Sequence, residues 1–125
     1  MPLHFLLDED TRDNSLLNAI DRHNADQPLE FLDVSRVGDP GGPPNGIQDP
    51  ELIQWATTWN RVIVSKDKNT LIHLHDQYVA MGNQTPGLLI IRPNTTILAL
   101  VESLALIAHY SEPEEWQSQS RFIPM

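Results

Sequence analysis

Short apolar runs alternate along the chain with stretches in which apolar residues recur at helical spacing. The runs read as strands because they are rich in Leu, Ile and Val and are bounded by polar, Gly or Pro residues. They cover residues 3–7, 29–37, 61–65, 87–92 and 121–123. Strands that alternate with helices of about ten residues indicate an α/β domain with a mainly parallel sheet.

The segments between these runs predict four helices. One follows Asp13 or Asn14 as N-cap, and one begins at Asp49, with Asp at the N-cap and Pro at the first helical position. Two more are predicted over residues 71–81 and 97–109. The Gly- and Pro-rich stretch that precedes Asp49 is predicted to be a loop.

Length, composition and charge limit the functions that this chain can have. The 125 residues predict a single domain over residues 1–125, and the absence of Cys excludes disulfides, thiolate metal sites and cysteine nucleophiles. No apolar run approaches the length of a membrane helix and no signal peptide is recognisable, so we expect a soluble, cytoplasmic protein. The formal net charge of −9 disfavours broad electrostatic binding of nucleic acid and suits a basic partner protein.

Acidic residues stand where two of the predicted strands end. Asp8, Glu9 and Asp10 follow the first strand, Asp67 follows the third, and Asp49 begins a helix just after the flexible loop. The carboxyl ends of parallel strands share one edge of a sheet, and oxygen-rich clusters there suit Mg²⁺ or Mn²⁺. Each acid alone also fits a solvated turn or a helix cap, but the coincidence of clusters favours a cation site.

Only one of Glu9 and Asp10 is expected to join Asp8, because successive residues of an extended segment face opposite sides. Lys66 and Lys68 flank Asp67, where they either pair with the acids or touch a substrate phosphate; we favour the ion pair. The sequence alone leaves open whether Glu9 or Asp10 faces the site.

Four segments resemble the small PIN-like proteins of the DUF5615 group, relatives of PIN-domain nucleases. They are "FLLDED", "QDPELIQWATTWNRVIVSKDKN", "GLLIIR" and "EEWQSQSRFIPM", in the same order along nearly the whole chain. The resemblance implies a three-layer α/β/α fold around a parallel sheet, with clustered acids that bind Mg²⁺ or Mn²⁺. It also implies metal-dependent RNA cleavage, often by the toxin of a toxin–antitoxin pair.

Carried over by position, the resemblance assigns catalytic and metal-binding roles to Asp8, Glu9, Asp49 and Asp67. Asn69 stands where members of the group often carry a further Asp, and would add a carbonyl oxygen as a ligand. In such a site metal-activated water would hydrolyse the RNA phosphodiester, and no protein nucleophile is needed.

Other functions remain open at this point. A catalytically weak PIN-like module would act by binding an antitoxin or by self-association as a homodimer. A haloacid dehalogenase-like phosphatase would use Asp8 as nucleophile and Asp10 as acid–base, but no later acidic pair follows the strand at residues 87–92. A phosphoacceptor receiver domain would need a Lys after its last strand, which "FIPM" lacks.

The remaining candidate groups favour structural roles. His73 and His75 lie two apart and would face different sides of a helix, which disfavours a shared metal; partly exposed side chains are expected. Trp55 and Trp59 lie four apart on one helical face, where packing in the core or against a partner explains them better than base stacking.

Overall fold

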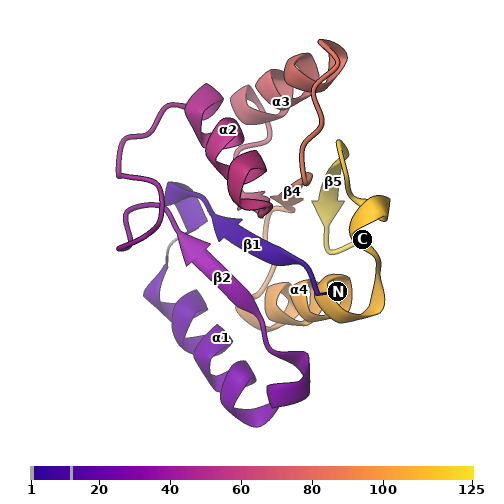
Figure 1. Cartoon of the computed structure of the whole chain (residues 1–125). Helices are drawn as coiled ribbons and strands as arrows, with labels where there is room; N and C mark the ends of the chain where they lie inside the picture. The colour runs from indigo at the N-terminus through magenta and orange to yellow at the C-terminus, as the bar shows by residue number, and fades with distance from the viewer. Residues whose placement is uncertain (1, 12) are drawn as a thin grey trace.

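The computed structural model describes residues 2–11 and 13–125, which form a three-layer α/β/α domain (Figure 1). The sheet has five parallel strands in the order β2-β1-β3-β4-β5. The strands are β1 (His4–Leu7), β2 (Asp33–Arg36), β3 (Val62–Ser65), β4 (Leu88–Ile91) and β5 (Ser120–Ile123), and the helices are α1 (Asn14–Asp26), α2 (Asp49–Trp59), α3 (Thr70–Ala80) and α4 (Ile97–Tyr110). The predicted fold class is confirmed.

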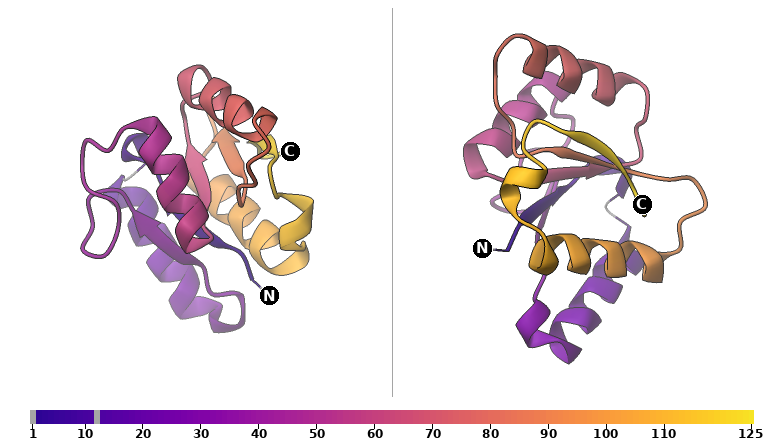
Figure 2. Two further views of the ribbon diagram at one scale, coloured as in Figure 1. Left: turned by 45° about the horizontal axis from the view of Figure 1, so that its top comes forward. Right: turned by 90° about the vertical axis from the view of Figure 1, so that its right-hand side faces the viewer.

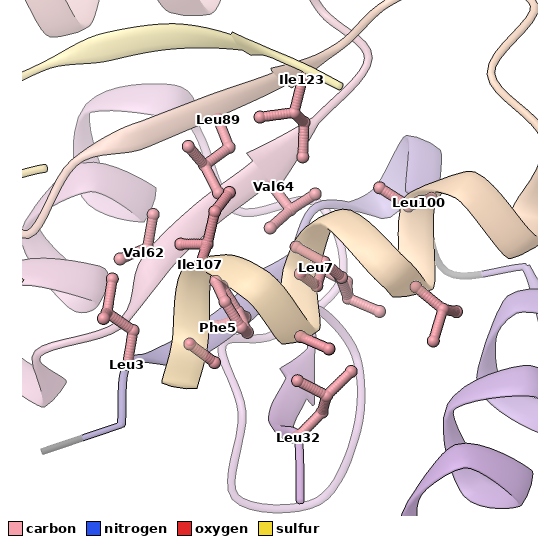
Figure 3. Close-up of a cluster of buried hydrophobic side chains, with 14 of the residues drawn as sticks. Leu3, Phe5, Leu7, Leu32, Val62, Val64, Leu89, Leu100, Ile107 and Ile123 are labelled. Carbon is pink, nitrogen blue, oxygen red and sulfur yellow. The ribbon is translucent and has the colours of Figure 1, made fainter. Parts of the chain in front are cut away.

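Two apolar cores lie on the two faces of this sheet. The side chains of Phe5 and Leu7 point from β1 into the core under α1 and α4, whereas Leu6 points into the core under α2 and α3. Figure 3 shows the first core, with α4 lying across the strands. Burial on both faces explains why the strands read as continuous apolar runs.

None of the described helices combines the length and the apolar character that a membrane-spanning helix needs.

The helices are divided between the faces so that α1 and α4 lie together and α2 and α3 lie together (Figure 2). In the strand order of the sheet, the connection from β1 to β2 leads toward one edge, and the connection from β4 to β5 leads toward the opposite edge. Because α1 and α4 nevertheless share a face, these two crossovers have opposite hands. A uniform hand, which is the strong preference of such connections, would have placed α4 beside α2 and α3.

Two sequence predictions are corrected at the ends of elements. The strand predicted over residues 29–37 is limited to β2, because Pro28–Glu30 forms a 3-10 turn and leaves Leu29 93% exposed. Helix α2 has Gln48 as its N-cap, so Asp49 is the first helical residue rather than the cap. Trp59 is 62% exposed and lies against Trp55 in a tilted pair, with ring centroids 5.9 Å apart; of the two settings predicted for these rings, the core does not hold Trp59, and packing against a partner stays a prediction.

His75 is buried, which corrects the expectation of a partly exposed side chain. Its Nδ1 lies 2.9 Å from Ser120 Oγ and its Nε2 lies 2.7 Å from Thr85 Oγ1. Burial lowers the pKa of His75, although the neighbouring Asp76 raises it. The imidazole therefore joins α3 to β5 and to the segment before β4 as a neutral polar contact.

Candidate functional site at the carboxyl edge of the sheet

The strand order places a topological switch point between the carboxyl ends of β1 and β3. These strands are neighbours in the sheet, and the chain leaves β1 for α1 on one face and β3 for α3 on the other. Such a switch point is where ligands bind in open α/β sheets. The first residue beyond β1 is Asp8, whose N–H donates to Val64 O at 3.0 Å, so its carboxylate stands at this point.

Ser65, the last residue of β3, is the centre of the polar cluster. Its buried Oγ lies 3.0 Å from Asp8 Oδ2 and 3.2 Å from Asp10 Oδ2, and it accepts the N–H of Asp67 at 3.0 Å. A hydroxyl carries one proton and can donate to only one of the two carboxylates at a time. Asp8 and Asp10 thus share one hydroxyl, and each accepts one backbone N–H besides, from Glu9 and from Lys66.

Asp10, rather than Glu9, is the second acid of the first cluster that joins Asp8. Both of its carboxylate oxygens lie 3.2 Å from the N–H of Lys66. Its pKa is raised, chiefly by burial of the carboxylate and further by the negative charge of Asp8, while the N–H of Lys66 and the hydroxyl of Ser65 act in the opposite direction. Sequence analysis left this choice open.

Asp49 reaches the same cluster from α2 on the opposite face of the sheet. Asp49 is the first residue of that helix, and its carboxylate makes no hydrogen bond or ion pair within the described parts of the chain. Its pKa is raised first by burial, and then by the negative charges of Asp8 and Asp67. Asp49 therefore lies near both strand-end clusters and has no structural partner that would account for it.

Asp67 combines a structural role with its place in the cluster. Its Oδ1 accepts the N–H groups of Asn69 at 2.9 Å and Thr70 at 3.0 Å, which caps the start of α3. The second carboxylate oxygen makes no hydrogen bond among the described residues. Asn69 is exposed and contributes its backbone N–H to this cap, while its side chain makes no capping bond and is not joined to the acids.

Glu9 points away from the other acids, toward the loop that precedes α2. Its Oε1 accepts the N–H of Gly46 at 2.5 Å, which connects the turn after β1 to residues 38–48. The structure thus brings together Asp8, Asp10, Asp49 and Asp67 and leaves Glu9 at the border. Ser65 was missed by sequence analysis, although a lone hydroxyl at the end of the apolar run "RVIVS" was a signal that could have marked it.

The cluster matches a hard divalent cation in charge and in donor type. All of its side-chain donors are oxygens, and mutual repulsion among the carboxylates contributes to the raised pKa of both Asp10 and Asp49. Within residues 2–11 and 13–125, however, no group of three or more Asp, Glu or His side chains is arranged to hold one ion. The fit is therefore one of charge and chemistry, not of a preformed coordination geometry.

Comparison with protein-family models, with curated proteins and with solved structures found no match for this chain. The resemblance to PIN-like proteins therefore stays a prediction from short motifs, and the case for the site rests on the geometry described above.

Replacing Asp49 with asparagine should stabilise the metal-free protein at neutral pH. A carboxyl whose pKa is raised by folding binds more protons in the folded state, so its ionisation opposes folding above that pKa. The raised pKa also means that burial and like charges outweigh the favourable helix dipole at this position. Urea unfolding in EDTA should show the Asp49→Asn variant more stable than wild type at pH 7, with the difference shrinking as the pH falls toward the ordinary pKa of Asp.

Asp21→Asn is the control, because Asp21 is an exposed acid on α1 outside the cluster. It should change stability little and without this pH dependence. A destabilised Asp49→Asn variant at neutral pH would show that Asp49 is not crowded by the other acids.

Proposed function

We propose that this protein is a metal-dependent ribonuclease of PIN-like type, with Mg²⁺ or Mn²⁺ held at the carboxyl edge of the sheet. The observation that carries the proposal is the gathering of Asp8, Asp10, Asp49 and Asp67 at the β1/β3 switch point, where crowding contributes to the raised pKa of two of them. Like charges held together at such a cost to stability favour a function that needs them. The proposed setting is the cytoplasm, where the protein would act on RNA as the toxin of a toxin–antitoxin pair.

In this proposal, Asp8, Asp49 and the free oxygen of Asp67 are the cation ligands, and Asp10 takes the place first given to Glu9. A divalent ion bound there would supply an activated water and a counter-charge for the phosphodiester. Ser65 orients Asp8 and Asp10 through its hydroxyl and acts as a positioning residue. Glu9 acts on the loop at residues 38–48, which borders the site. Asn69 is proposed at most as an outer ligand, because its side chain is exposed.

A second candidate function is a PIN-like binding module without catalytic activity. An apolar surface on α4 and on the turn before β2 favours it, since Leu98, Leu106 and Tyr110 are 61–69% exposed and Leu29 is 93% exposed. Such side chains suit an antitoxin or a second copy of the chain as a homodimer. The absence of a preformed group of three metal-binding side chains among the described residues is consistent with this candidate.

Thermal unfolding with and without Mn²⁺ tests the proposed cation site. Binding to the folded state alone should raise the free energy of unfolding by about 2.7 kcal/mol when Mn²⁺ is at about 100 times its Kd. Asp8→Asn and Asp49→Asn should each abolish most of this gain, because each removes a proposed ligand. Asp49→Asn is the sharper variant, since its carboxylate makes no hydrogen bond within the described residues.

The control is again Asp21→Asn, which should keep the full response to Mn²⁺. A wild type that is indifferent to Mn²⁺ would contradict the cation site and leave the binding module as the better function. An equal response in all four proteins would place the ion elsewhere on this acidic chain.

A further inference from the structure

A cleft lies next to the acidic cluster, beyond the carboxyl ends of β3 and β4. It has a volume of about 360 Å³ and is lined by Lys66, Lys68 and the segment 91–95, which includes Arg92. β3 and β4 are neighbours, with Ser65 paired to Ile90, so Lys66 and Arg92 leave the sheet side by side. The cleft therefore lies on the same edge of the sheet as the acids.

The cleft concentrates positive charge in a chain whose formal net charge is −9. Lys66 and Lys68 are the only lysines of the sequence, and both line this cleft. Neither ammonium makes a direct ion pair within the described residues, so the direct ion pair expected from the sequence is not formed; the charge of Lys66 nevertheless acts on the Asp10 carboxylate and lowers its pKa. By contrast, Arg36 and Arg61 are paired with Asp39 and Asp33. Both ammonium groups thus lack a direct ionic contact among the described residues and can each approach an anion in the cleft.

Arg92 is held in place by the end of the chain. Its Nε donates to Pro124 O at 2.8 Å, and its guanidinium carbon lies 5.5 Å from the centroid of the Phe122 ring. The two terminal NH₂ groups make no hydrogen bond to any described residue. A guanidinium fixed at Nε and over a ring presents these donors at little entropic cost, and their planar geometry suits phosphate oxygens.

Lys66 connects the cleft to the acidic cluster. Its backbone N–H donates to Asp10, whereas its side chain lines the cleft. A strand of RNA with one phosphodiester at the acids would therefore run past Lys66 toward Lys68 and Arg92. In a chain of this charge, local cations are needed to hold a polyanion that the molecule as a whole repels.

We propose that Lys66, Lys68 and Arg92 form a subsite for the backbone phosphate of a single-stranded RNA next to the phosphodiester at the acidic cluster. This inference rests on the proposed ribonuclease function for its substrate. It adds the direction in which the strand lies, from the β1/β3 switch point toward the end of β4. The contacts are to phosphate, so the subsite gives affinity and register but no sequence preference.

The test is a fluorescence titration of a short labelled single-stranded RNA in EDTA, repeated over a range of salt concentrations. Each lost phosphate contact on a single strand lowers the slope of log Kobs against log salt by about 0.7. The Lys66→Gln/Lys68→Gln variant loses the contact to this one phosphate, so it should lose about 0.7 from that slope and bind about tenfold more weakly at low salt. Lys66→Arg/Lys68→Arg should restore binding, because it returns both charges.

Arg22→Gln/Arg121→Gln is the matched control, since it removes two positive charges at positions outside the cleft. It should change the slope by much less than the lysine variant. Equal losses in the two variants would mean that only net charge matters and would overturn the subsite. Absence of binding by the wild type would overturn it as well.

Two further outcomes separate this inference from the proposed function. Titration with inorganic phosphate identifies the ligand: tight phosphate binding without RNA binding would assign the cleft to a free anion and overturn the RNA subsite. Because the titration is done in EDTA, it does not depend on the cation. If RNA binding depends on the lysines but the protein does not respond to Mn²⁺, the subsite is supported and the proposed ribonuclease function is contradicted. If Mn²⁺-dependent cleavage is unaffected by the lysine substitutions, the ribonuclease function is supported and the subsite is overturned.

Discussion

The Asp8→Asn variant is expected to cleave RNA about 10³-fold more slowly than the wild type in the presence of Mn²⁺. Loss of one central charged ligand removes several kcal/mol of transition-state stabilisation, and about 4 kcal/mol corresponds to this factor. The fold should survive, because asparagine keeps the oxygen that accepts the Glu9 N–H at 2.8 Å, and its amide can still meet the hydroxyl of Ser65. The measurement is the initial rate on a labelled single-stranded RNA at saturating Mn²⁺.

Asp21→Asn serves as the control for this experiment and should cleave at the rate of the wild type. Cleavage that persists unchanged in Asp8→Asn would assign the activity to a contaminating nuclease or to a different site. If the wild type itself does not cleave RNA but is stabilised by Mn²⁺, the acidic cluster binds the ion without performing the proposed reaction.

Replacing Phe5 with alanine should destabilise the protein by about 3–5 kcal/mol. Phe5 is fully buried on β1, an inner strand of the sheet, in the core under α1 and α4 that Figure 3 shows. This loss in the free energy of unfolding comes from the apolar surface that is no longer buried and from the cavity left between the strand and the helices. It approaches the whole net stability of a small domain. Urea unfolding at neutral pH measures it as a large decrease of the transition midpoint.

Phe31→Ala is the matched control, because the same atoms are removed from a side chain that is 54% exposed. It should cost less than about 1 kcal/mol, as is usual for substitutions at the surface. The backbone carbonyl of Phe31, which lies 2.8 Å from His109 Nε2, is unaffected by the change. Similar losses in the two variants would contradict the assignment of Phe5 to the central core.

The secondary structure was predictable where local patterns and tertiary packing agree. "RVIVS" and "GLLIIR" became β3 and β4 within a residue or so at each end, because continuous apolar runs suit strands buried on both faces. The strand prediction failed at residues 29–32, where apolar residues follow Pro28 at a 3-10 turn and the side chain of Leu29 faces solvent. A short apolar run has no period from which its burial can be inferred.

The candidate site was predictable in part. Asp8 and Asp67 follow from their places after strands, and Asp49 from its place after the loop. The choice between Glu9 and Asp10 was not predictable, because it depends on the 3-10 turn Glu9–Thr11 and on the position of Ser65 in the neighbouring strand. Asn69 was predicted as a ligand from its place in the motif, but its side chain is not joined to the acids, because a position in a sequence motif does not fix where a side chain lies.

By itself, the sequence determined that apolar strands alternate with helices, that the chain carries excess acid, and that several acids stand at the ends of strands. Only the tertiary structure decided that β1 and β3 are neighbours, so that Asp8 meets Ser65 from 57 residues away, and that α4 lies beside α1. Local propensity depends on residues a few positions apart. Strand order and the choice of face instead depend on which long-range packing buries both apolar faces of the sheet, and no short stretch of sequence contains that information.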